Sequence, residues 1–216
     1  MPSSDRLLLF SLAAAALIAI PGPSVLYVVA RALRHGRRTG LVSVLGVETG
    51  ELVHVVAATV GLSALIAASA STFTVVKLAG AAYLVVIGLR TWFGHGAALP
   101  DLATERRPPL PAWPVFRQGA LVGALNPKTA LFFVAFLPQF VEPARGSTWL
   151  QILVLGLAWT VIAIVSDSCY AIAAGALGGL LAPSRRAAKV ERIVSGSIFV
   201  GLGVVAADAH ATHLQR

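Results

Sequence analysis

Long apolar stretches dominate the sequence and are the feature that most restricts its fold. Six of them approach or exceed the about 20 residues that a helix needs to cross a bilayer; they cover residues 7–30, 41–67, 73–92, 116–141, 149–181 and 190–207. Only 12% of the 216 residues are charged, whereas about 25% is usual for a soluble domain. We therefore predict an all-α integral membrane protein with six transmembrane helices.

The first apolar stretch has the composition of a signal peptide, but no small-x-small cleavage site follows it, and apolar character resumes after Pro23. We expect this segment to be retained as a spanning helix. The single cysteine, Cys169, lies within an apolar stretch, where it is expected to act as a small buried hydrophobic residue.

Positive charges are concentrated in alternate loops. The first, third and fifth loops hold twelve of the 17 Lys and Arg residues, namely Arg31, Arg34, Arg37, Arg38, Arg90, Arg106, Arg107, Arg117, Arg185, Arg186, Lys189 and Arg192. Such a bias marks the cytoplasmic side of a membrane protein. We therefore predict a multi-pass protein of the bacterial cytoplasmic (inner) membrane with both termini outside. The net charge of +8 needs no nucleic-acid partner, because these charges lie in short loops.

One proline-rich segment divides the chain. Residues 93–115 contain five prolines, and such a segment cannot span a membrane as a helix because lipid cannot replace the lost backbone hydrogen bonds. We predict a cytoplasmic linker here, between a first three-helix repeat at 1–92 and a second at 116–216. Three is an odd number, so the two repeats are expected to be inverted relative to each other, as in many transporters.

The first helix of each repeat carries a helix-breaking motif, Pro21-Gly22-Pro23 in one and Asn126-Pro127-Lys128 in the other. Broken backbone within a membrane is tolerated where it lines a cavity, and the new helix N-termini attract anions. These motifs predict that a substrate carboxylate binds between the breaks. The predicted substrate-binding residues are Gly22, Pro23, Ser24, Asn126, Pro127 and Lys128. The alternative is a pair of plain proline kinks.

Acidic residues inside the spans are the candidates for proton coupling. Glu48, Glu51 and His54 share one face of the second span, and Asp167 stands alone in the fifth. Carboxylates in a membrane are costly and normally face a cavity or a partner. We predict proton-coupling roles for Glu51, Asp167 and Glu48. Glu48 could instead pair with an arginine of the first loop, and His54 could be a hydrogen-bonded structural residue.

Three further features bear on packing and charge. A lysine just after a helix break opposes the helix dipole, so Lys128 is expected to have an anionic partner, either substrate or a carboxylate. Lys77 is expected to reach the interface by snorkelling, and Tyr170 to hydrogen-bond near Asp167 or to pack. Glycines four residues apart allow close helix approach and permit a homodimer; the pairs are Gly46 with Gly50, Gly119 with Gly123, and Gly175 with Gly179.

Three segments resemble the lysine exporter (LysE/RhtB) family of amino-acid efflux proteins. They are PGPSVLYVVARALRHGRRTGLVSVLG at 21–46, LAGAAYLVVIGL at 78–89 and FRQGALVGALNPKTALFFVAFLPQFV at 116–141. The resemblance implies export of amino acids or close derivatives from the cytoplasm, coupled to proton entry. It assigns matching positions to Gly22, Pro23, Glu51, Asn126, Pro127 and Lys128.

Other functions are less well supported by the residues. Export of an inorganic cation would call for clustered Cys, Met or His ligands, and the five histidines are scattered. An intramembrane enzyme would need a motif such as His-Glu-x-x-His, which the sequence lacks. A non-transporting scaffold would not explain the paired breaks and buried acids. We predict no metal and no cofactor; the expected partners are an amino-acid substrate, protons and the lipid bilayer.

Overall fold

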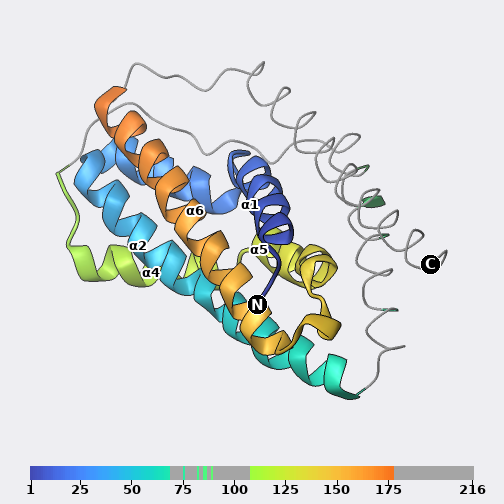
Figure 1. The fold of residues 1–216 in the computed structure, drawn as a ribbon. Coiled ribbons are helices and arrows are strands. Elements are labelled where there is room, and N and C mark those ends of the chain that lie inside the picture. The colour runs from blue at the N-terminus through green and yellow to red at the C-terminus, as the bar shows by residue number, and fades with distance from the viewer. Residues whose placement is uncertain (69–74, 76–81, 83–84, 87–88, 90–107, 178–216) are drawn as a thin grey trace.

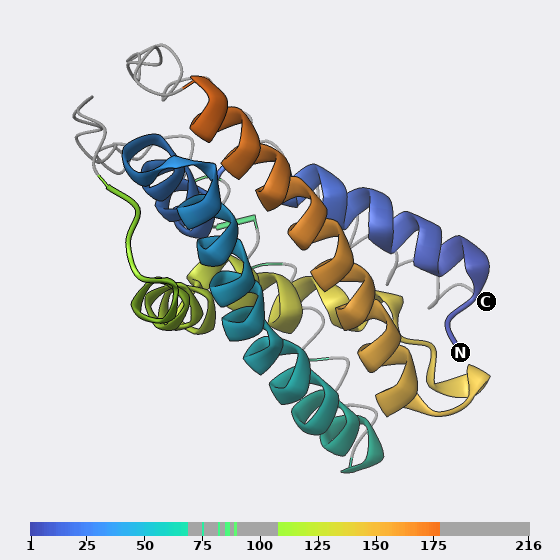
Figure 2. The same cartoon turned by 90° about the vertical axis from the view of Figure 1, so that its left-hand side faces the viewer.

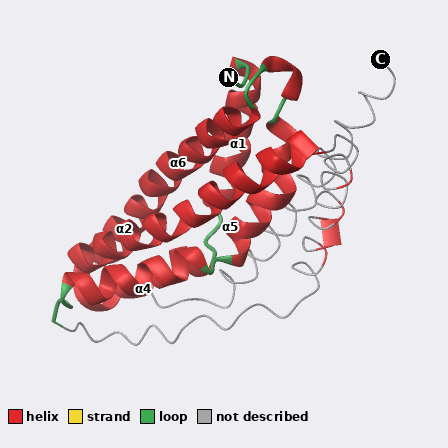
Figure 3. Ribbon diagram, turned by 90° about the horizontal axis from the view of Figure 1, so that it is seen from below, coloured by secondary structure: helices red, strands yellow, loops and turns green. Residues whose placement is uncertain are grey.

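A computed structural model describes residues 1–68, 75, 82, 85–86, 89 and 108–177 (Figure 1). Across these residues the chain is helical and contains no strand (Figure 3), which confirms the all-α class. The elements are α1 (Ser4–Ile18), α2 (Pro23–Ala68), α4 (Ala112–Ala124), α5 (Pro127–Leu131), the π-helix η1 (Phe132–Phe136), the 3₁₀ segments η2 (Leu137–Phe140) and η3 (Pro143–Arg145), and α6 (Thr148–Leu177).

The first predicted span is broken where the sequence predicts. α1 starts after Ser3, whose hydroxyl accepts a hydrogen bond from the Arg6 backbone N–H at 3.4 Å, and it ends at Ile18. Residues 19–22 are not helical, and α2 begins at Pro23. Proline suits the first position of a helix because the N–H that it lacks would have no partner there.

The predicted first loop, around residues 31–40, is almost entirely helical. α2 continues through it and departs from helical geometry only at Gly36, with φ 82° and ψ 167°, a conformation open almost only to glycine. A Cβ added to Gly40 would lie 2.7 Å from the Cβ of Ala32, so the chain folds back at Gly36. A straight helix over Pro23–Ala64, 42 residues, would be about 63 Å long; the turn at Gly36 divides it into arms at 23–35 and 37–68.

The second arm of α2 and α4 pack backbone to backbone through glycines. A side chain at Gly46 would collide with the carbonyl of Phe116, and one at Gly50 with the carbonyl of Ala120. Gly123 of α4 meets the α2 backbone in the same way. The glycine spacing predicted this close approach, and the structure confirms it for these two pairs. Of the third pair, Gly175 contacts Arg37, and its partner lies outside the described residues.

The fourth predicted span has two irregularities, of which the sequence predicted one. α4 ends at Ala124 and α5 begins at Pro127, which gives the expected break. The helix then widens into η1 and tightens into η2, which contains Pro138. Proline lacks a backbone donor and its ring clashes with the preceding turn, which accounts for a change of helix type just before it.

α6 is the most apolar of the described candidate spans and packs along the second arm of α2 (Figure 2). It also contacts α1, so it joins the two broken regions. Three described helical stretches are long and apolar enough to cross a membrane: Pro23–Ala64, Ala112–Phe140 and Thr148–Ala176. Of the third predicted span only residues 75, 82, 85–86 and 89 are described, and they are helical. The sixth predicted span, the linker up to residue 107, and Lys77 lie outside the described residues.

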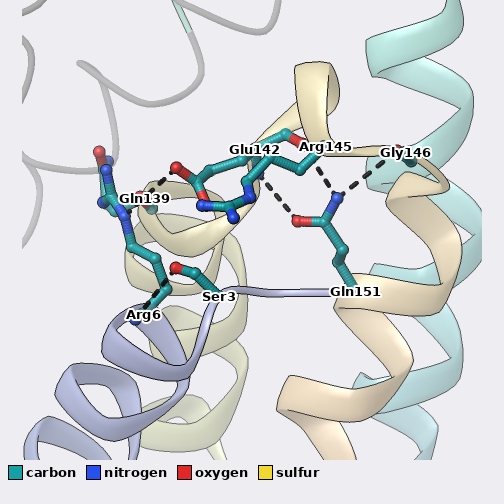
Figure 4. Close-up of polar contacts among 7 residues, drawn as sticks. All are labelled: Ser3, Arg6, Gln139, Glu142, Arg145, Gly146 and Gln151. Carbon is teal, nitrogen blue, oxygen red and sulfur yellow. Dashed lines mark hydrogen bonds and ion pairs between the residues drawn. The ribbon is translucent and has the colours of Figure 1, made fainter.

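A polar cluster joins the start of α1 to the start of α6 (Figure 4). The guanidinium of Arg6 lies 3.7 Å from the Glu142 carboxylate and donates to the Gln139 carbonyl at 3.3 Å. Arg145 approaches the same carboxylate at 3.8 Å. The buried Gln151 side chain exchanges two 3.0 Å hydrogen bonds with the Glu142 backbone. We call these five residues the Glu142 cluster; it holds the end of the bundle opposite Gly36.

Candidate functional site

The two helix breaks meet inside the bundle. The Asn126 amide, at the second break, donates to the Ser24 hydroxyl beside the first break at 2.8 Å. The Lys128 ammonium donates to the carbonyl of Leu17 at 2.7 Å and to that of Ile20. A Cβ on Gly22 would lie 2.9 Å from the Lys128 side chain, so any larger residue here would make the lysine shift. The breaks that the sequence placed in separate halves thus form one site.

The backbone carbonyls exposed by the first break are bound by side chains from other helices. Lys128 holds two of them, and the Tyr170 hydroxyl donates to the Ala19 carbonyl at 2.7 Å. The end of α1 carries partial negative charge, but these backbone carbonyls are neither of the partners predicted for Lys128, a substrate or a carboxylate. Tyr170 hydrogen-bonds, as one of its two predicted roles required, but its partner is this carbonyl.

Glu51 is the most heavily hydrogen-bonded acid in the site. Its Oε1 accepts from the Asn126 amide at 2.8 Å and from the Thr129 hydroxyl at 2.8 Å. Its Oε2 accepts from the Trp159 indole N–H at 3.1 Å. The Asn126 nitrogen has two hydrogens but three acceptors at 2.8 Å, so only two of these bonds form at once. Donors from α5 and α6 therefore fix the Glu51 carboxylate, which α2 contributes.

Glu48 and Asp167 are buried close by. Each side chain is 3% exposed. Among the described residues, no hydrogen-bond partner is found for the buried Glu48 Oε2, and no arginine pairs with this carboxylate. The alternative pairing of Glu48 with a first-loop arginine is therefore not what the structure shows.

A small cavity of about 20 Å³ lies where these groups converge. That volume has room for about one water molecule. It is lined by Ile18, Gly22, Ser24, Val25, Glu48, Glu51, Asn126, Lys128, Thr129, Trp159, Ala163 and Asp167. We call it the central cavity. Of the predicted site residues only Pro23 and Pro127 are not in its lining, and each begins the helix next to a lining residue.

The sequence analysis did not select Thr129 or Trp159. Thr129 follows Asn126 by three residues and so lies on the same helical face. Trp159, Ala163 and Asp167 are spaced by four, which places them along one face of α6. That spacing from Asp167 was the available signal. His54 instead contacts the Gly123 carbonyl at 3.3 Å and lies outside the cavity lining, as its structural interpretation expected.

An aromatic cluster fills the bundle between the central cavity and the Glu142 cluster. The Phe132 ring lies 4.2 Å from that of Trp159 and 5.0 Å from that of Phe136, measured between centroids. Phe10 packs on both Phe132 and Phe140, at 5.5 and 5.3 Å. These rings are buried, so among the described residues they occupy the space between the cavity and this end of the bundle.

Comparison with known proteins agrees with this architecture. The profile of the LysE type translocator family matches residues 15–209. An uncharacterised membrane protein of Vibrio cholerae is 33% identical, over 88% of this chain and 91% of its own length. A homoserine/homoserine lactone efflux protein of Salmonella typhimurium is 31% identical over 88% and 89%. A leucine efflux protein of Salmonella choleraesuis is 25% identical over 86% of each chain.

No solved structure matches the chain. The family match covers most of the sequence, including both helix breaks, and it agrees with the resemblance found in the three sequence segments. The apolar helices and the similarity to membrane proteins make this a membrane protein of a transporter family. The chain belongs to the LysE type translocators.

Proposed function

We propose that this protein exports amino acids or close derivatives from the cytoplasm by secondary transport, with proton entry as the driving force. One observation carries the proposal: two helix breaks, from opposite halves of the chain, meet at a cavity lined by three acids and a lysine. The printed names of two relatives, homoserine/homoserine lactone efflux protein and leucine efflux protein, point to the same class of substrate.

The cavity offers a partner for each charged end of an amino acid. Lys128 stands beside Gly22 and Ser24 and can exchange its carbonyl partners for a substrate carboxylate. The predicted substrate-binding residues Pro23, Asn126 and Pro127 shape the same surface through the two helix starts. In the same lining, Glu48, Glu51 and Asp167 supply negative charge for the substrate ammonium or sites for the coupling proton.

The proposed cycle requires the central cavity to open. About 20 Å³ is too small for an amino acid, so the described conformation is closed around its centre. We infer that six spans form two inverted repeats, at 1–92 and 116–216, joined by the linker at 93–115, and that their relative motion exposes the cavity to each side in turn. The Gly36 end, rich in arginine, would face the cytoplasm of a bacterial inner membrane, and both termini the outside. A homodimer stays a prediction.

The described residues of the site do not support the two alternative functions, export of an inorganic cation and a non-transporting scaffold. No group of three or more His, Cys, Asp or Glu side chains within 1–68 and 108–177 is arranged to hold a metal ion, and nothing there favours an inorganic cation. A scaffold would not need polar side chains from three helices around one small cavity.

Reconstituted vesicles test the proposal. Vesicles with an acidic lumen should accumulate labelled L-homoserine or L-leucine against the concentration gradient of the amino acid, because protons leaving the lumen drive it inward. A protonophore should abolish the accumulation, and protein-free vesicles should show none. If monodisperse protein moves neither amino acid under the gradient, amino-acid export of these two types is excluded.

A further inference from the structure

Two glutamates one helical turn apart have opposite surroundings. Glu51 accepts three hydrogen bonds of 2.8–3.1 Å, from Asn126, Thr129 and Trp159. Glu48 is buried to the same degree, 3% exposed against 4%, yet no described residue donates to its Oε2. Both line the central cavity. On the same helix face, one glutamate is thus held by three donors, whereas the other has an oxygen to which no described residue donates.

This difference has an energetic consequence. A carboxylate that accepts several hydrogen bonds is stabilised in its charged form, because the donors replace water. An isolated buried carboxylate has no such compensation, and the cost of ionising it amounts to several kcal/mol even after relaxation of the protein. Glu48 must therefore hold a proton, or a cation must stand next to it, whenever the cavity is closed.

The charged groups around Glu48 do not supply that cation. Two acids, Glu51 on its own helix and Asp167 from α6, line the cavity with it, and so does Lys128 of α5. The lysine ammonium is itself bound to the carbonyls of α1. No described residue therefore donates to the Glu48 Oε2, and the lysine of the cavity is engaged by α1.

We propose that Glu48 is the proton-carrying residue and that Glu51 is a positioning residue, which joins the two helix breaks to α6. This inference rests on the proposed proton-coupled transport. When the cavity faces outside, one proton from water binds the Glu48 carboxylate. When the cavity faces the cytoplasm, the same proton passes to water, and the carboxylate stays ionised while the substrate ammonium is nearby. Each proton taken up from outside is released to the cytoplasm, so the cycle needs no other reactant.

Infrared spectroscopy tests the protonation directly and does not depend on transport. The purified protein should show a carbonyl stretch from a protonated, buried carboxyl group that weakens as pH is raised. Glu48→Gln should remove this component, Glu51→Gln should keep it, and Glu48→Asp should shift it. Asp5→Asn, at the exposed start of α1, is the matched control. If the spectrum of Glu48→Gln equals that of the native protein, the assignment is wrong.

Stability and transport separate the two roles. Glu51→Gln should lower the thermal midpoint, because it disturbs three buried hydrogen bonds, whereas Glu48→Gln should leave it unchanged or raise it. In vesicles, Glu48→Gln should cut gradient-driven accumulation of L-homoserine or L-leucine at least tenfold. Accumulation that survives in Glu48→Gln would overturn the inference and leave the transport proposal standing. A native protein that moves neither amino acid but shows the infrared pattern would overturn the transport proposal and leave the protonation of Glu48 standing.

Discussion

One indole N–H holds the second oxygen of Glu51. The Trp159 ring also packs on Phe132, so a substitution can remove the N–H donor and keep an aromatic ring in place. Trp159→Phe keeps an aromatic ring but leaves a buried carboxylate oxygen without its donor, which costs roughly 1.5–3 kcal/mol. We expect a lower thermal midpoint in detergent. Trp149→Phe is the matched control because Trp149 is 53% exposed; an equal loss in both variants would contradict the role given to the indole.

Lys128 is expected to stabilise the end of α1. Lys128→Met keeps most of the side-chain length but removes the donor to the Leu17 and Ile20 carbonyls. Hydrogen bonds from a charged group are worth roughly 1.5–3 kcal/mol each, so the last turn of α1 should open more often. Hydrogen exchange measured by mass spectrometry should quicken for peptides covering residues 15–20. Arg145→Met, at a side chain that is 56% exposed, should leave that region unchanged.

At the residue scale the sequence indicated acids and helix-breaking motifs but not their partners. Glu51, Asn126 and Lys128 stand out because charge and proline are unusual within a span. Trp159 and Thr129 do not, since tryptophan and threonine are ordinary in apolar helices. Which acid receives donors is decided by how α5 and α6 pack against α2, and no local pattern reports that. The sequence therefore predicted proton coupling for Glu51, Asp167 and Glu48, and left pairing with an arginine open for Glu48 alone.

At the element scale, close packing of α2 on α4 depends on glycines that admit no side chain. Gly50→Ala would drive a methyl group into the Ala120 carbonyl, and overpacking of this kind costs about 1–3 kcal/mol. The variant should show reduced thermal stability and more aggregate on size exclusion. Gly61 lies on the same helix, and no described residue has an atom within 4 Å of its missing side chain, so Gly61→Ala should be neutral or slightly stabilising. Identical behaviour of the two variants would argue against this interface.

Helix breaks were more predictable than loops at this scale. Two prolines around Gly22 and one after Asn126 remove backbone donors, so both breaks follow from local chemistry. The predicted first loop was wrong in extent, because Gly36 alone reverses the chain and the surrounding basic residues remain helical. The π-helix before Pro138 was not predicted, since a single proline does not reveal whether the helix kinks, widens or ends.

For the whole molecule, the aromatic cluster and the Glu142 cluster together close one end of the bundle. The ion pairs of Glu142 are long, at 3.7 and 3.8 Å, and the Arg6 and Glu142 side chains are 28% and 26% exposed. Such pairs contribute about 0–1 kcal/mol, so this end is held weakly by charge and mainly by the packed rings. Ion pairs this weak would add little to the cost of opening this end, which the proposed transport cycle requires.

Removing the ion pair between Arg6 and Glu142 should therefore increase only modestly the fraction of molecules in which this end of the bundle is open. A cysteine at Ala163, which lines the central cavity, reports the opening when Cys169 is replaced by serine. Arg6→Gln should raise the rate at which a water-soluble maleimide labels Ala163→Cys, by about fivefold at most, since 1 kcal/mol corresponds to about that factor. Asp5→Asn, which changes charge one residue away, should leave the rate unchanged. Equal labelling with and without Arg6 would mean that the rings alone close this end, and Phe132→Ala would then be the variant that opens it.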